Sequence, residues 1–316
     1  MFLSDLLFSL NATVPVFLMM VFGFFCRRIG LLDDHTTSQL NRFVFRTTLP
    51  ALLFADLSKA DFRSVWDGKF VLFCVIITLV SVGAAWLFSL LHKDRAERGE
   101  IIQAAYRSSA AVLGIAFVNN IYGKATMAAL MIVATVPLYN IAAVTVLSLT
   151  SPEGKKSGRS LLLSTAKGII TNPIILGIIV GILWSLAKIP QPAILSRSVS
   201  YLAGMATPLS LIALGASFKT ADAKDDLPVC LGIAFIKLVL FCGAFLPIAV
   251  HLGFRGEKLV AALVMLGSAT TGSCFVMAKN LGHKGSITAL AVMLTTLLSA
   301  FTLTGWLFIL KRLGYI

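Results

Sequence analysis

Apolar residues in this chain form runs of about twenty, and short polar stretches separate one run from the next. A run of roughly 20 residues can cross about 30 Å of hydrocarbon as an α-helix, which satisfies its own backbone hydrogen bonds. The pattern therefore predicts an all-α polytopic membrane protein with ten transmembrane helices. These cover residues 6–26, 39–55, 69–91, 103–121, 125–149, 161–186, 195–218, 227–252, 259–281 and 286–310.

The prolines of these runs recur at half the chain length. Pro15 and Pro173 are 158 positions apart, as are Pro50 and Pro208, and all four are candidate helix breaks. Five spans per half is an odd number, so the halves would have opposite orientations in the membrane. We predict an inverted repeat of residues 1–150 and 159–316, joined by a connecting loop at 151–158. Such repeats are typical of secondary transporters, whose binding site lies between the halves.

The fourth and ninth spans each contain a window rich in small and hydroxyl residues, at 108–114 and 267–274. Glycine lets the backbone leave helical geometry, and hydroxyls can satisfy backbone groups freed at membrane depth. We expect crossed helix breaks at 111–116 and 269–274, where helix N-termini would favour an anion. Close helix packing without a substrate is the alternative interpretation. The candidate substrate-binding residues here are Ser108, Ser109, Gly114, Ser268, Thr270, Thr271 and Ser273, with Gly272 as a helix break.

The composition supports a membrane location. Hydrophobic residues make up 58% and charged residues 13% of the 316, and the mean hydropathy is +0.91. The net charge of +13 is spread over many short loops, which fits lipid headgroups better than nucleic acid. A weak excess of Lys and Arg places the connecting loop in the cytoplasm and both termini outside a bacterial inner membrane. The five cysteines have no metal-binding spacing, so we expect neither a metal nor a cofactor.

Few polar residues lie within the predicted spans. Arg46 could pair with a substrate carboxylate or reach the headgroups, and Lys237 could be an internal counter-charge or replace a coupling ion. Asn41, Asn140 and Asn172 could contact substrate or cap broken helices. No Asp or Glu is expected deep in a span, which counts against a conventional carboxylate for proton coupling.

Several short motifs occur in a fixed order along the chain. They are Asn41 with residues 49–54, Pro137 to Asn140, residues 171–173 with Gly177 and Gly181, and residues 208–211 with Gly215. In this order and spacing the chain resembles the auxin efflux carrier family, which includes bacterial malonate and malate carriers and the plant PIN auxin exporters. The likeness spans essentially the entire sequence.

The resemblance implies a ten-helix fold related to bile-acid symporters and sodium/proton antiporters. Spans 1, 2, 6 and 7 would form a scaffold, and spans 3–5 and 8–10 a moving transport domain with crossed broken helices. A homodimer would form through the scaffold. The chain departs from the family at the crossover, because Ala116 stands where a proline is usual and Ser108 or Ser109 where an asparagine is.

Secondary transport by alternating access is the leading function, with a small organic anion as substrate: a dicarboxylate such as malonate or malate, or an aromatic carboxylate. A cation/proton antiporter on the related fold would need a buried aspartate pair. An intramembrane enzyme would need an HExxH motif, paired aspartates or a nucleophile–base pair, and none is visible. A membrane sensor without transport is the remaining alternative.

Overall fold

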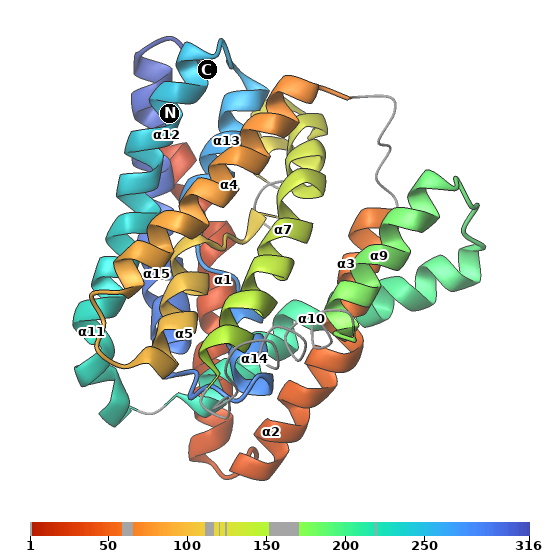
Figure 1. The fold of residues 1–316 in the computed structure, drawn as a ribbon, viewed down its shortest axis with the longest axis vertical. Helices are drawn as coiled ribbons and strands as arrows, with labels where there is room; N and C mark the ends of the chain where they lie inside the picture. Colours follow the sequence, from red (N-terminus) through yellow and green to blue (C-terminus); the bar gives the residue numbers. More distant parts are fainter. Residues whose placement is uncertain are drawn as a thin grey trace.

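A computed structural model gives the fold of the protein (Figure 1). It describes residues 2–58, 66–110, 117–119, 121–123, 125–151, 171–218 and 220–316. Within these ranges the regular secondary structure is helical.

Five helical segments in the described part of the chain are long and apolar enough to cross a membrane. They are Gly68–Ser89 (α4), Thr126–Thr150 (α7), Ala193–Ser217 (α10), Asp225–His251 and Ser286–Arg312 (α15). Each coincides with a predicted span. Large apolar side chains such as Leu72, Leu79 and Leu87 of α4 point away from the protein, as a surface in contact with lipid requires. The chain is therefore a polytopic, helical membrane protein.

Two of the predicted spans contain a π-helical turn. The second span consists of α2 (Asp34–Phe43), the π-helical turn η1 (Val44–Thr48) and α3 (Leu49–Ser58). The eighth consists of α11 (Thr220–Phe235), η2 (Ile236–Leu240) and α12 (Phe241–His251). Each π-helical turn carries one of the two cations noted in the sequence, Arg46 in η1 and Lys237 in η2. Such single turns are frequent at functional sites.

The four repeated prolines play different parts. The helices α1 (Phe2–Arg28) and α10 continue through Pro15 and Pro208, so these two prolines do not end a helix as expected. Pro173 is the first residue of α9 (Pro173–Leu186), where its missing N–H costs nothing. Pro50 follows the π-helical turn at the start of α3. Neighbouring helices can satisfy the carbonyl that a proline frees within a span, which explains the unbroken helices.

Two pairs of helices pack closely against each other. The helix α1 packs along α10, and α3 packs along α9. Glycine permits the close approach in the second pair, because a Cβ atom on Gly177 would lie 2.6 Å from the carbonyl oxygen of Pro50. At the sequence offset of 158 residues, α1 corresponds to α9 and the segment ending in α3 corresponds to α10. The two pairs therefore correspond to each other at the offset that the sequence predicts for the repeat.

In Figure 1, α3 and α9 stand apart from a larger group of helices, in which α1 also packs beside α15. There α4 and α7 pack against α5 (Arg95–Tyr106), while α12 and α15 pack against α13 (Glu257–Gly267). The short helix α14 (Ser273–Asn280) follows α13 after a break. This arrangement places the ends of α5 and α13 inside the molecule, at the site described next.

Candidate functional site

The site is built around two helices that stop inside the protein. The helix α5 ends at Tyr106, and Arg107 is extended (φ −82°, ψ 121°); α13 ends at Gly267, and Ser268 is extended (φ −77°, ψ 160°). The N–H of Ser109 donates to the carbonyl oxygen of Ala269 at 2.8 Å. One backbone hydrogen bond thus joins the two interruptions and satisfies groups that the breaks free.

The positions of the breaks can be compared with the sequence windows. The second break, between Gly267 and Ser273, lies within the predicted window. The first begins at Arg107, earlier than the predicted residues 111–116. Those residues, which include the candidate Gly114, lie outside the described part of the chain. The hydroxyls of Ser108 and Ser109 therefore belong to the non-helical stretch itself.

Three side chains hold the first break in place. Lys237 is completely buried, and its Nζ donates to the carbonyl oxygen of Arg107 and to Oγ of Ser108, both at 2.8 Å. Thr270 donates through Oγ1 to the carbonyl oxygen of Ala104 at 2.8 Å. From α5, Gln103 donates to the carbonyl oxygen of Cys274 in α14 at 3.0 Å. Broken helix ends leave carbonyl oxygens that need donors, and Lys237 and Thr270 supply them at the end of α5. The contact of Gln103 joins α5 to α14.

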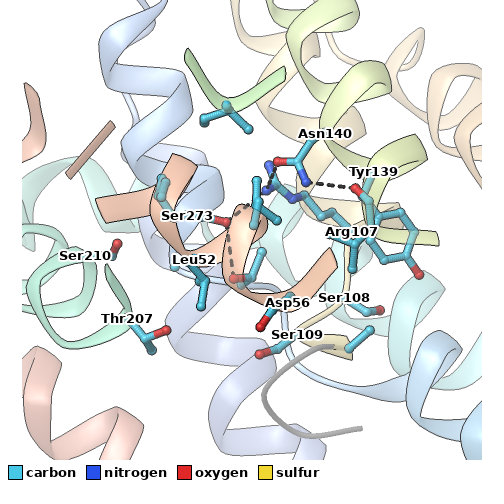
Figure 2. Close-up of a pocket in the computed structure, with 17 residues that line it drawn as sticks. Leu52, Asp56, Arg107, Ser108, Ser109, Tyr139, Asn140, Thr207, Ser210 and Ser273 are labelled. Atoms are coloured by element: carbon cyan, nitrogen blue, oxygen red, sulfur yellow. Dashed lines mark hydrogen bonds between the residues drawn. The ribbon is translucent and has the colours of Figure 1, made fainter. Parts of the chain in front are cut away.

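The cation at the centre of the site is Arg107, which is 4% exposed. Its Nη2 donates to Oδ1 of Asn140 at 2.7 Å and to Oγ of Ser273 at 3.0 Å (Figure 2). Its Nη1 lies 2.6 Å from Sδ of Met277. These three partners are uncharged. Asn140 is itself fixed, because its Nδ2 donates to the carbonyl oxygen of Val136 at 2.8 Å. The guanidinium is thus oriented by neutral groups.

A pocket of about 60 Å³ lies beside Arg107, between the two helix groups. The lining combines apolar side chains with hydroxyls, the guanidinium of Arg107 and the carboxylate of Asp56 (Figure 2). The lining comes from α3 (Leu49, Leu52, Leu53, Asp56), the first break and the residue after it (Arg107, Ser108, Ser109, Ala110), α7 (Val136, Tyr139, Asn140), α9 (Ile174), α10 (Thr207, Ser210) and the second break with the start of α14 (Thr271, Gly272, Ser273).

Comparison with known proteins identifies the kind of protein that carries this site. The profile of the family described as "Membrane transport protein" matches residues 8–307. The chain belongs to this family. The resemblance to the auxin efflux carriers is thereby confirmed, and the protein is an integral membrane transporter, not an enzyme.

Individual relatives are similar along nearly the whole length. A protein of Rhizobium meliloti (strain 1021) named "Putative malonate transporter" is 26% identical over 310 residues, which cover 94% of each chain. An "Uncharacterized transporter" of Methanothermobacter thermautotrophicus is 21% identical over 300 residues, covering 94% of this chain and 97% of its own. The Escherichia coli (strain K12) "Uncharacterized transporter YfdV" is 24% identical over 301 residues, covering 91% and 93%.

The transporter brings six of the candidate residues to one pocket. Five come from the two breaks or their flanks, and Asn140 comes from α7. Ser268 and Thr270 are buried next to this pocket without lining it. The residues that line the pocket are Ser108, Ser109, Asn140, Thr271, Gly272 and Ser273.

Two other asparagines lie away from the pocket lining. Asn172 caps α9, because its Oδ1 accepts from the N–H of Ile174 at 2.9 Å. Asn41 is buried in α2, and its backbone carbonyl oxygen accepts from Nδ2 of Asn280 at 3.2 Å. The capping alternative therefore describes Asn172, whereas Asn41 joins α2 to α14.

Arg46 does not reach the pocket. The buried side of η1 consists of Val44, Phe45 and Thr48, so Arg46 lies on the exposed side of this turn. An exposed arginine within a span can extend its guanidinium toward headgroups or water. The sequence analysis did not select Arg107. Its position directly before the first hydroxyl window was the signal that could have indicated it.

Two acids that the sequence assigned to connectors lie in helices, and one of them is buried. Glu100 is 1% exposed, and its carboxylate accepts from the N–H of Gly285 at 2.8 Å and from the N–H and hydroxyl of Thr288 at 3.1 and 2.9 Å. Asp56 lines the pocket. Both acids were assigned to connectors, but α5 begins at Arg95 and α3 continues to Ser58, so both lie in helices.

Proposed function

We propose that this transporter moves a small organic anion, a dicarboxylate such as malonate or malate, by alternating access. The observation that carries the proposal is the buried guanidinium of Arg107, oriented by neutral partners at the junction of two interrupted helices. A guanidinium binds a carboxylate through two parallel hydrogen bonds, and a dry environment strengthens such a pair. The hydroxyls of Ser108, Ser109 and Thr271 are further donors beside it.

The size of the pocket favours a short substrate. A water molecule needs about 10–15 Å³ on this measure of volume, so 60 Å³ has room for roughly four to six water-sized groups. Malonate and malate have somewhat more heavy atoms than this, so the pocket must widen slightly even for them, and a rigid aromatic ring would require more widening than malonate, the shortest of these substrates. The relative named "Putative malonate transporter" agrees with this choice.

We also propose that the architecture is a five-plus-five inverted repeat of residues 1–150 and 159–316, with a two-fold axis in the membrane plane. The equivalent pairing of α1 with α10 and of α9 with α3 supports it, as do the two helix interruptions in corresponding spans. In this arrangement α1, α2–α3, α9 and α10 form the scaffold, which would also carry a homodimer contact, and the other helices form the transport domain.

The pocket lies between these two proposed parts. The helices α3, α9 and α10 of the scaffold line one side, and the breaks together with α7 line the other. A movement of one part against the other would open the pocket to either face of the membrane in turn, which is how alternating access operates in repeat-based carriers.

A cation antiporter is the second candidate, because Asp56 places one carboxylate in the pocket. Transport into proteoliposomes separates the two. We expect radiolabelled malonate to accumulate by counterflow, unlabelled malate to compete with it, and benzoate and monovalent cations to compete weakly. Accumulation of a cation that malonate does not affect would contradict the anion assignment and favour the antiporter.

A further inference from the structure

A second cavity lies apart from the substrate pocket, where α4 and α7 end and α5 begins. Its volume is about 270 Å³, and none of the residues that line it lines the substrate pocket. Arg95 and Arg98 contribute its charge, and Trp86, Leu90 and Leu149 contribute much of its apolar surface. The combination of two guanidiniums, an indole and a hollow of this size calls for an explanation beyond helix packing.

The two arginines stand three residues apart and therefore on one face of α5. Arg98 is held by two donations, from Nε at 3.0 Å and Nη2 at 2.9 Å, to the carbonyl oxygen of His92 just beyond α4. A guanidinium has five N–H donors, so these two contacts leave others to face a ligand. The attraction of a cation to the C-terminal end of α4 explains the contact of Arg98 with His92. It explains neither the cavity nor the position of Arg95.

The acids near this helix end have other partners. The Oδ1 atom of Asp94 accepts from the N–H of Ala96 at 2.9 Å and thereby caps α5. The carboxylate of Glu97 is paired with Lys284 at 2.9 Å and with His92 at 2.7 Å. Neither acid lines the cavity, so Arg95 and Arg98 are its charged lining residues.

The cavity also lies at the end of a surface that faces lipid. The outer face of α4 exposes Leu72, Leu79 and Leu87 by 58, 56 and 68%. Trp86, 38% exposed in the last turn of α4, has the position that indoles take at the membrane–water interface. An acyl chain lying along α4 would therefore place its headgroup at the level of Arg95 and Arg98.

We propose that this cavity is a binding site for the phosphate of an anionic phospholipid, with Arg95 and Arg98 as its ligands and Trp86 against the glycerol region. Basic pockets between transmembrane helices bind acidic headgroups in this way. Because α5 carries Arg107 at its opposite end, a lipid bound here would hold the same helix that presents the substrate cation.

The test measures lipid retention and does not depend on transport. The purified transporter is exchanged into mixed micelles with equal amounts of phosphatidylglycerol and phosphatidylcholine, and bound lipid is counted by native mass spectrometry. We expect the wild type to retain phosphatidylglycerol preferentially. Arg95→Gln should reduce this preference about fivefold, and the double variant with Arg98→Gln about thirtyfold. If the loss of Arg98 impairs folding, the Arg95→Gln variant alone still tests the proposal.

A matched control removes two other positive charges from the same side of the membrane, Arg28→Gln with Lys93→Gln, and should keep the preference. Equal retention of both lipids by the wild type, or an unchanged preference in the Arg95→Gln variant, would overturn the proposal. A separate arm adds inorganic phosphate to lipid-depleted protein. Thermal stabilisation by phosphate that requires Arg95, together with complete displacement of phosphatidylglycerol, would assign the site to free phosphate instead.

Discussion

Replacement of Arg107 by Gln tests the central claim about the substrate site. This change removes the buried cation while keeping a polar side chain of moderate length. Truncating one partner of a buried, hydrogen-bonded charge pair costs about 2–5 kcal/mol, which corresponds to roughly 30-fold to a few thousand-fold weaker dicarboxylate binding. Arg107→Lys keeps the charge but not the bidentate geometry, so we expect it to recover only part of this affinity.

The same substitution should have a small effect on stability. Oδ1 of Asn140 and Oγ of Ser273 would each lose a donor, at about 1–3 kcal/mol per buried acceptor. Removal of a buried cation also relieves a desolvation penalty of several kcal/mol, which opposes that loss. We expect the midpoint of thermal unfolding to move by no more than about 5 °C. A binding defect without a large stability defect is the signature of a substrate contact.

The assay combines malonate binding by isothermal titration calorimetry in detergent with counterflow in proteoliposomes. Arg46→Gln is the matched control, because Arg46 is exposed on η1, and it should bind and transport as the wild type does. Malonate affinity of the Arg107→Gln variant within about twofold of the wild type would refute the assignment, since a lost ionic contact must cost more than that. Unfolding of this variant with normal binding in the folded fraction would show a structural role instead.

Three further predictions concern packing, capping and pH. Gly177→Ala should destabilise the transporter by about 1–3 kcal/mol in denaturant unfolding, because the added Cβ would meet the backbone of α3. Gly204→Ala is the control, since the space around its Cβ is open, and it should not destabilise the protein. Equal effects of the two substitutions would contradict the close approach of α3 and α9. Glu100→Ala leaves buried donors at the start of α15 without an acceptor, so it should lower the free energy of unfolding by about 2 kcal/mol or more. The amides at the start of α15 should then exchange their hydrogens faster, and unchanged exchange would argue against the cap. The hydrogen bond from Lys258 holds the pKa of Asp67 below its ordinary value. The contribution of this carboxylate to stability should therefore be present at neutral pH and be lost as the pH falls through the acidic range. Asp67→Asn should lack this part of the pH dependence of thermal unfolding, and identical profiles for the variant and the wild type would disprove the pairing.

The apolar pattern was sufficient to place the five long spans that the described residues contain. A segment in hydrocarbon must satisfy its backbone groups internally, so a run of about twenty apolar residues has little choice but to form a helix. The window between Gly267 and Ser273 was equally informative, because glycine and hydroxyl residues are what a chain needs to interrupt a helix at depth. Both features depend on local composition, which the sequence contains in full.

The depth and direction of each charge depended on the tertiary structure. The start of α5 at Arg95, eight residues before the predicted start of its span, turned Glu100 from a connector residue into a buried cap. Each residue along a helix turns the side chain by about 100°, so small errors in register decide whether a side chain faces lipid or protein. Arg46 and Arg107 could not be told apart by sequence for this reason. Packing of η1 directed Arg46 outward, and the end of α5 directed Arg107 into a pocket formed by residues from distant parts of the chain.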